Sequence, residues 1–103
     1  MKVQTSRCGA ELRIKLIGDM DEYSAAEVRR ICDKLLDENP SAESVVINLA
    51  EVAFMDSTGI GFLIGRYKKA KRMGVPLMVE KPNFAADKVL SLSGIYALIP
   101  RAD

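Results

Sequence analysis

The chain has 103 residues, with 15 Lys and Arg against 14 Asp and Glu, two cysteines and no histidine. The lack of histidine excludes a Ser-His-Asp or Cys-His catalytic pair and removes the commonest metal ligand, so we expect no metal site and no cofactor. We expect a single domain over residues 1–103, in the cytoplasm, with Cys8 and Cys32 as buried thiols. The longest uncharged run, residues 89–100, is too short to span a bilayer, and we expect no membrane insertion.

The first elements are predicted to form a β-hairpin followed by a helix. Leu12, Ile14 and Leu16 alternate with charged residues, which predicts a half-buried strand that pairs with residues 2–7 around Gly9. Residues 18–21 break this alternation. Ser24 and Glu27 have the spacing of a capping box at a helix start. The helix is predicted to end at Asn39-Pro40 and to bury one stripe, made of Val28, Ile31, Cys32, Leu35 and Leu36.

Residues 44–49 are almost all apolar, as in a strand that is covered on both faces. A second helix is predicted over residues 58–73, ended by Gly74 and Pro76. Its buried stripe is predicted to contain Ile60, Leu63, Ile64 and Tyr67. A short strand at 77–79, a helix at 83–92 and an extended segment at 95–99 follow. This alternation predicts an α/β sandwich with a mixed sheet of four to five strands and three to four helices.

The two halves of the chain differ in net charge, and most basic residues of the second half lie on the helix predicted at 58–73. Residues 1–51 carry seven basic and ten acidic side chains, and residues 52–103 carry eight and four. Five of those eight cations fall within seven positions: Arg66, Lys68, Lys69, Lys71 and Arg72. No second basic stripe accompanies this cluster. We therefore interpret it as a solvated helix face and expect no direct DNA binding.

The most informative segment is Val-Ala-Phe-Met-Asp-Ser-Thr-Gly-Ile-Gly at residues 52–61. An apolar strand leads into an acid, two hydroxyls and two glycines at a helix start, where unpaired N–H groups attract anions. Asp56 or Ser57 could simply cap the helix. A phosphate-binding loop would need a glycine-rich pattern that is absent, and an aspartic-protease element is excluded because Thr58 separates Ser57 from Gly59. A third functional interpretation is that Ser57 itself receives a phosphate.

Residues 54–71, Phe-Met-Asp-Ser-Thr-Gly-Ile-Gly-Phe-Leu-Ile-Gly-Arg-Tyr-Lys-Lys-Ala-Lys, resemble the central segment of STAS domains. The resemblance is to the sporulation-type anti-sigma factor antagonists, and it extends to Gly-Asp-Met-Asp-Glu-Tyr at 18–23 and Ser-Gly-Ile-Tyr at 93–96. It implies a protein without catalytic activity that is the substrate of its partner, an anti-sigma factor serine kinase related to histidine-kinase ATPases. The unphosphorylated form would bind the kinase and free the forespore sigma factor. A serine phosphatase would reverse the modification.

Carried over by position, the resemblance assigns Ser57 as the phosphorylation site. It also implies a partner-binding surface composed of Asp21, Glu22, Asp56, Ser57, Thr58, Gly59, Ile60 and Gly61. Two alternatives stay open at this point. One is a STAS interaction module of a transport or stress-sensing complex that is not phosphorylated, and the other is a small nucleotide-binding protein that uses the same helix terminus.

Overall fold

A mixed four-stranded sheet organises the chain, which a computed structural model describes over residues 1–103. The strands are β1 (Lys2–Cys8), β2 (Glu11–Met20), β3 (Ser44–Met55) and β4 (Leu77–Glu80), in the order β1-β2-β3-β4. β1 and β2 are antiparallel, whereas β2, β3 and β4 run parallel. The helices are α1 (Glu22–Glu38), α2 (Ser57–Arg72) and α3 (Phe84–Ser93). The predicted α/β class and mixed sheet are confirmed.

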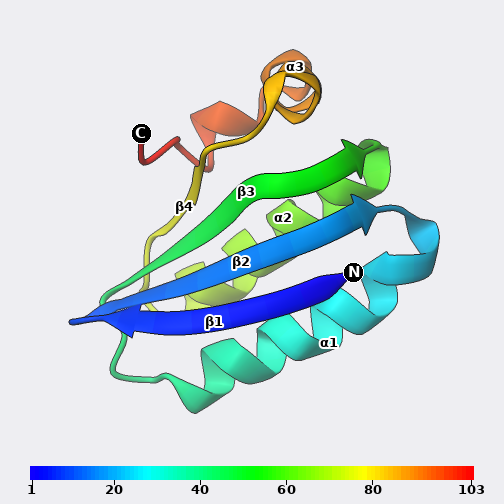
Figure 1. The fold of residues 1–103 in the computed structure, drawn as a ribbon. Helices are drawn as coiled ribbons and strands as arrows, with labels where there is room; N and C mark the ends of the chain where they lie inside the picture. The colour runs from blue at the N-terminus through cyan, green and yellow to red at the C-terminus, as the bar shows by residue number, and fades with distance from the viewer.

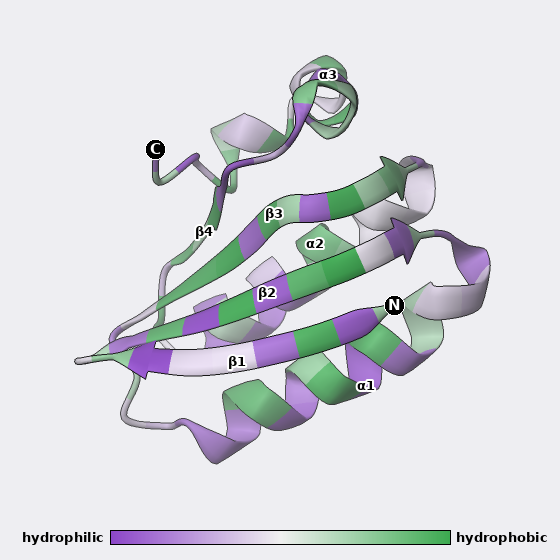
Figure 2. Ribbon diagram, in the orientation of Figure 1, coloured by the Kyte–Doolittle hydropathy of each residue, from purple (hydrophilic) through white to green (hydrophobic).

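The helices α1 and α2 lie side by side on one face of the sheet, and α3 packs beside β3 at the end away from β1 (Figure 1). Along β2, green and purple alternate in Figure 2, because every second residue enters the core. Leu12, Ile14 and Leu16 are buried as predicted, and Val45 to Ile47 of β3 are buried on both faces. None of the helices combines the length and the hydropathy needed to cross a membrane.

The alternation along β2 is broken near residue 18 as predicted, and the strand continues through residues 18–20 with register shifts against β3. Three other local predictions are wrong. The capping box of α1 is Asp21 with Ser24, three residues before the predicted one. Residues 95–97 form a 3₁₀ turn instead of an extended segment. Cys8 is exposed, because it ends the edge strand β1, whereas Cys32 is buried.

Two ion pairs join α1 to α2. The Arg66 Nε lies 2.7 Å from Asp33 Oδ1, and the Lys69 Nζ lies 2.9 Å from Asp37 Oδ1. Arg66 was expected on the solvated basic face, but its side chain is only 7% exposed. It also lies over the Phe62 ring, 5.2 Å from the ring centre. Burial lowers the pKa of Arg66 against the opposing effect of Asp33, and burial raises the pKa of the neighbouring Cys32 thiol to about 12.

A polar network occupies the sheet face opposite α1 and α2. Arg13 on β2 donates to the carboxylates of both Glu11 and Glu80, and the Asn48 side chain donates to Glu80 at 3.0 Å. These residues lie on neighbouring strands, since Asn48 on β3 is in register with Glu80 on β4. Burial alone would raise the pKa of Glu80, but the hydrogen bonds from Arg13 and Asn48 outweigh it and leave that pKa lowered. The network therefore holds three strands together through a carboxylate that must stay ionised.

Removing Asp33 should destabilise the fold more than removing Asp37. The Asp33→Ala variant leaves the Arg66 charge buried without its partner, and we expect a loss of about 2–3 kcal/mol in the free energy of unfolding. The Asp37→Ala variant removes a more exposed pair and should cost less than about 1 kcal/mol. Chemical denaturation of the two variants measures the difference. Equal losses would show that the Arg66 charge does not depend on Asp33.

Stability should fall in acid through Glu80. Its pKa is lower in the folded than in the unfolded chain, so its contribution is present above the unfolded value of about 4.3 and is lost as the pH falls through the folded value. Denaturation curves for wild type and Glu80→Gln should differ at pH 7 and converge between about pH 5 and pH 3. A gap that stayed constant across this range would contradict the argument.

Candidate functional site

Two helices begin side by side at one edge of the sheet. The parallel strands β2 and β3 end at Met20 and Met55, which are register partners. Each strand is followed at once by an aspartate, Asp21 or Asp56, that is the N-cap of the next helix. Because paired strands are roughly 5 Å apart, the two caps and the first turns of α1 and α2 share one surface. All eight residues of the predicted partner surface lie in this region.

Asp21 starts α1 with a reciprocal set of hydrogen bonds. Its Oδ1 accepts the N–H groups of Tyr23 and Ser24, each at 3.0 Å, and its own N–H donates to the Ser24 hydroxyl at 3.1 Å. The bond from the Ser24 N–H is the main reason why the pKa of Asp21 is lowered. Asp21 is therefore ionised, and its carboxylate is occupied by the first N–H groups of α1. The next residue, Glu22, is exposed.

Asp56 is the N-cap of α2, with one capping bond, and leaves Ser57 free. The Asp56 Oδ1 accepts the N–H of Thr58 at 2.8 Å. Ser57 is the first residue of the helix and is exposed, and its hydroxyl takes no part in the hydrogen bonds of the fold. The expectation that Asp56 or Ser57 caps the helix is resolved in favour of Asp56. The Ser57 hydroxyl is consequently available to another molecule.

Gly59 and Gly61 have different surroundings. Gly59 is buried, and a Cβ there would lie 2.5 Å from Cγ of Met55 and 3.1 Å from Cγ of Met20. It lets α2 approach the ends of both strands, and it does not reach the surface. Gly61 is exposed, and a Cβ there would have no neighbour within 4 Å. Ile60 is half-buried against the core.

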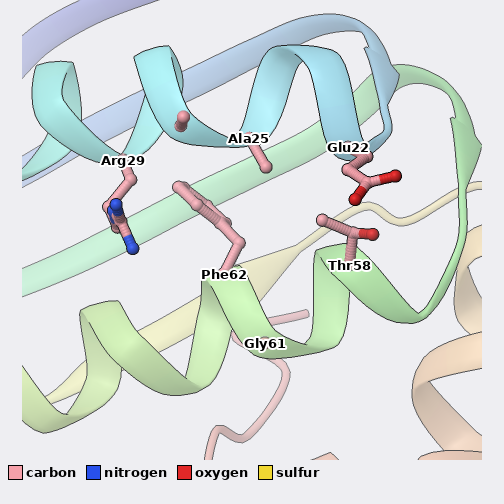
Figure 3. Close-up of a pocket in the computed structure, with 7 residues that line it drawn as sticks. Glu22, Ala25, Arg29, Thr58, Gly61 and Phe62 are labelled. Atoms are coloured by element: carbon pink, nitrogen blue, oxygen red, sulfur yellow. The ribbon is translucent and has the colours of Figure 1, made fainter.

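A groove of about 370 Å³ separates the first turns of α1 and α2. In Figure 3, Glu22 and Thr58 face each other across one end, Arg29 lies at the other, and the Phe62 ring lies between Arg29 and Ala25. Small residues line the part between these ends: Ala25, Ala26 and Gly61. Thr58, which lines the groove, directly follows Ser57 in the first turn of α2.

Some residues of this surface could not be assigned from the predicted motif. Tyr23 has an exposed fraction of 97%, and Arg29 and Phe62 line the groove. The repeated Met-Asp pair at 20–21 and 55–56 was a signal for the two aspartate caps. Glu22, Ala25 and Arg29 are three and four residues apart, so they lie on the same face of α1. This spacing does not predict that the face packs beside α2.

Comparison with known proteins agrees with this architecture. The family model of the STAS domain matches residues 2–102. An anti-sigma F factor antagonist of Paenibacillus polymyxa is 30% identical over 92 residues, which are 89% of this chain and 78% of that protein. An anti-sigma-B factor antagonist of Bacillus subtilis is 28% identical over 89 residues, covering 86% of this chain and 79% of that protein.

The fold also matches solved structures of the anti-sigma factor antagonist SpoIIAA. The unphosphorylated form superposes with a TM-score of 0.80 at 20% identity, over 99% of this chain and 89% of that chain. The phosphorylated form gives a TM-score of 0.72 at 20% identity, over 99% and 92%. At 20% identity, these two matches show that the fold is shared.

The chain therefore belongs to the STAS domain family. Within that family it belongs with the anti-sigma factor antagonists, so the resemblance predicted from residues 54–71 is confirmed. These relatives are regulatory proteins.

Alanine substitutions should distinguish the two glycines. In a helix, glycine is less favourable than alanine by about 1 kcal/mol, so Gly61→Ala should raise the free energy of unfolding by up to that amount. Gly59→Ala forces Met55 to move within the core, and it should be less stable than Gly61→Ala by about 1–3 kcal/mol. Thermal and chemical denaturation of both variants provide the measurement. Equal stability would mean that Gly59 is not needed for close packing.

Proposed function

We propose that this protein is a phosphorylation-switched antagonist of an anti-sigma factor that is itself a serine kinase. The unphosphorylated form binds the kinase and frees a sigma factor, which the sporulation-type resemblance identifies as the forespore factor. Transfer of a phosphate to Ser57 ends the binding, and a serine phosphatase restores it. The exchange takes place in the cytoplasm, where the sigma factor acts, and the protein catalyses no step of it.

The exposed hydroxyl of Ser57 is the observation that carries this proposal. It lies at the first position of α2, and capping of the helix is performed by Asp56. A kinase can therefore engage Ser57 without breaking a bond that the fold needs. A phosphate at a helix N-terminus is also favoured by the helix dipole, so the modified chain stays folded.

Phosphorylation changes the charge of this surface strongly. A phosphate adds about −1.5 to −2 charge beside Asp21, Glu22 and Asp56, in a chain whose net charge is +1. A kinase active site holds the serine next to the phosphates of its nucleotide, and these phosphates repel a phosphate on Ser57. The phosphate on Ser57 must also lose its hydration water when the two proteins dock. A penalty of about 2.8 kcal/mol weakens binding roughly 100-fold.

Incubation with the cognate anti-sigma factor and ATP should add one phosphate to the wild-type chain and none to Ser57→Ala. Intact-mass spectrometry reads the result. Ser91→Ala serves as a matched control, because Ser91 is also an exposed helical serine, and this variant should be phosphorylated as wild type is. The Ser57→Ala variant should unfold within about 0.5 kcal/mol of wild type, since the hydroxyl makes no bond in the fold.

Two outcomes would contradict the proposal. Phosphate incorporation into Ser57→Ala would move the site to another residue. A phosphorylated wild-type protein that bound the anti-sigma factor as tightly as the unphosphorylated one would remove the switch.

A further inference from the structure

We propose that the groove between α1 and α2 receives a segment of the anti-sigma factor. The segment carries one apolar side chain, flanked by a cation that faces Glu22 and a carboxylate that faces Arg29. This inference rests on the proposed function and adds the chemistry of the contact. It also extends the partner surface beyond the predicted motif, to Ala25, Ala26, Arg29 and Phe62.

Gly61 is the first reason to assign an occupant. Glycine in a helix interior is unfavourable, and Gly61 lies one turn inside α2. Close packing explains Gly59, where a Cβ would meet Met55, but no atom of this chain lies within 4 Å of a Cβ at Gly61. Gly65 has the same free space, so the fold requires neither of these two glycines, and of the two only Gly61 lines the groove. At Gly61, close approach of another molecule to the helix backbone accounts for the glycine.

The charges of the groove determine the chemistry of the occupant. Glu22 and Arg29 line opposite ends of the groove, and neither joins any of the ion pairs of the fold. They are seven residues apart on α1, which separates them by about 10.5 Å along the helix axis and prevents them from pairing with each other. A segment with a cation and an anion at that separation satisfies both charges at once.

The apolar part of the groove is rigid. Phe62 is buried except for the surface that lines the groove, and its ring packs against the guanidinium of Arg66. Arg66 is in turn held by Asp33. The ring therefore cannot turn away without disturbing the contact between α1 and α2. A fixed apolar surface between two charged ends suits one aliphatic or aromatic side chain of a partner.

The position of the groove connects this contact with the phosphorylation site. Thr58 lines the end of the groove near Glu22 and directly follows Ser57. A segment seated in the groove holds its protein against the first turn of α2, next to the Ser57 hydroxyl. The contact thus orients the kinase toward its substrate and contributes binding energy that does not depend on the hydroxyl itself.

The test measures the affinity of full-length variants for the anti-sigma factor with ADP, by titration calorimetry. Gly61→Leu adds a side chain at the groove whose Cβ meets no neighbouring atom, and it should bind about tenfold more weakly or worse. Gly65→Leu is the matched control, because Gly65 has the same free space one turn further along but does not line the groove, and it should bind within about threefold of wild type. Thermal unfolding confirms that both variants are folded.

Arg29→Glu is a second variant that does not depend on the tolerance of the helix for leucine. It reverses an exposed charge and should also weaken binding by about tenfold, while Arg30→Glu on the neighbouring face of α1 should have little effect. Weaker binding of Gly61→Leu and Arg29→Glu, with both controls intact, supports the proposal.

The failures can be told apart. If Ser57→Asp weakens binding but Gly61→Leu and Arg29→Glu do not, the groove is not a contact, while the phosphorylation switch stands. If the wild-type protein neither binds the anti-sigma factor nor accepts a phosphate from it, both proposals are overturned. If sedimentation shows a dimer that Gly61→Leu dissociates, the occupant is a second copy of this chain, and the assignment to the anti-sigma factor is wrong.

Discussion

The parallel pairing of β2 with β3 is the constraint on which the site depends. It brings Met20 and Met55 into register, so that the aspartate after each strand caps a helix at the same edge of the sheet. Helices that begin together present their unpaired N–H groups to the same side. Gly59 completes the arrangement, because it lets α2 start against both methionines. The Ser57 hydroxyl is left at the surface as a result of this packing.

The groove depends in addition on how α1 is held against α2. At the groove end, small residues leave space between the helices. Further along, the Asp33–Arg66 and Asp37–Lys69 ion pairs join them. Arg66 makes two contacts, because its guanidinium pairs with Asp33 and also packs on the Phe62 ring. The buried cation thus connects the packing of the two helices with the apolar surface of the groove.

The sequence predicted the α/β class, the hairpin, the three helices and the junction between β3 and α2 at which the candidate site lies, because each has a local signal. Alternation marks β2, and the Asp-Ser-Thr-Gly segment marks the start of α2. Where a prediction failed, contacts between residues distant in the chain decided the outcome. Arg66, expected on the solvated face, is buried and pairs with Asp33 of the neighbouring helix. The groove was not predictable in this way, because it exists only between two helices that are separated in the chain by a strand.

The lack of histidine and the hydrogen bonding at the start of α2 are both consistent with the proposed function. A protein that is modified by its partner needs no general base of its own. It needs an exposed nucleophile that lies on a rigid element and makes no hydrogen bond within the fold. The fold must also tolerate a new charge at that position. Asp56 takes the capping role that would otherwise fall to Ser57, and a helix terminus accommodates an anion. Under the proposed function, phosphorylation therefore changes binding at the surface and leaves the fold intact.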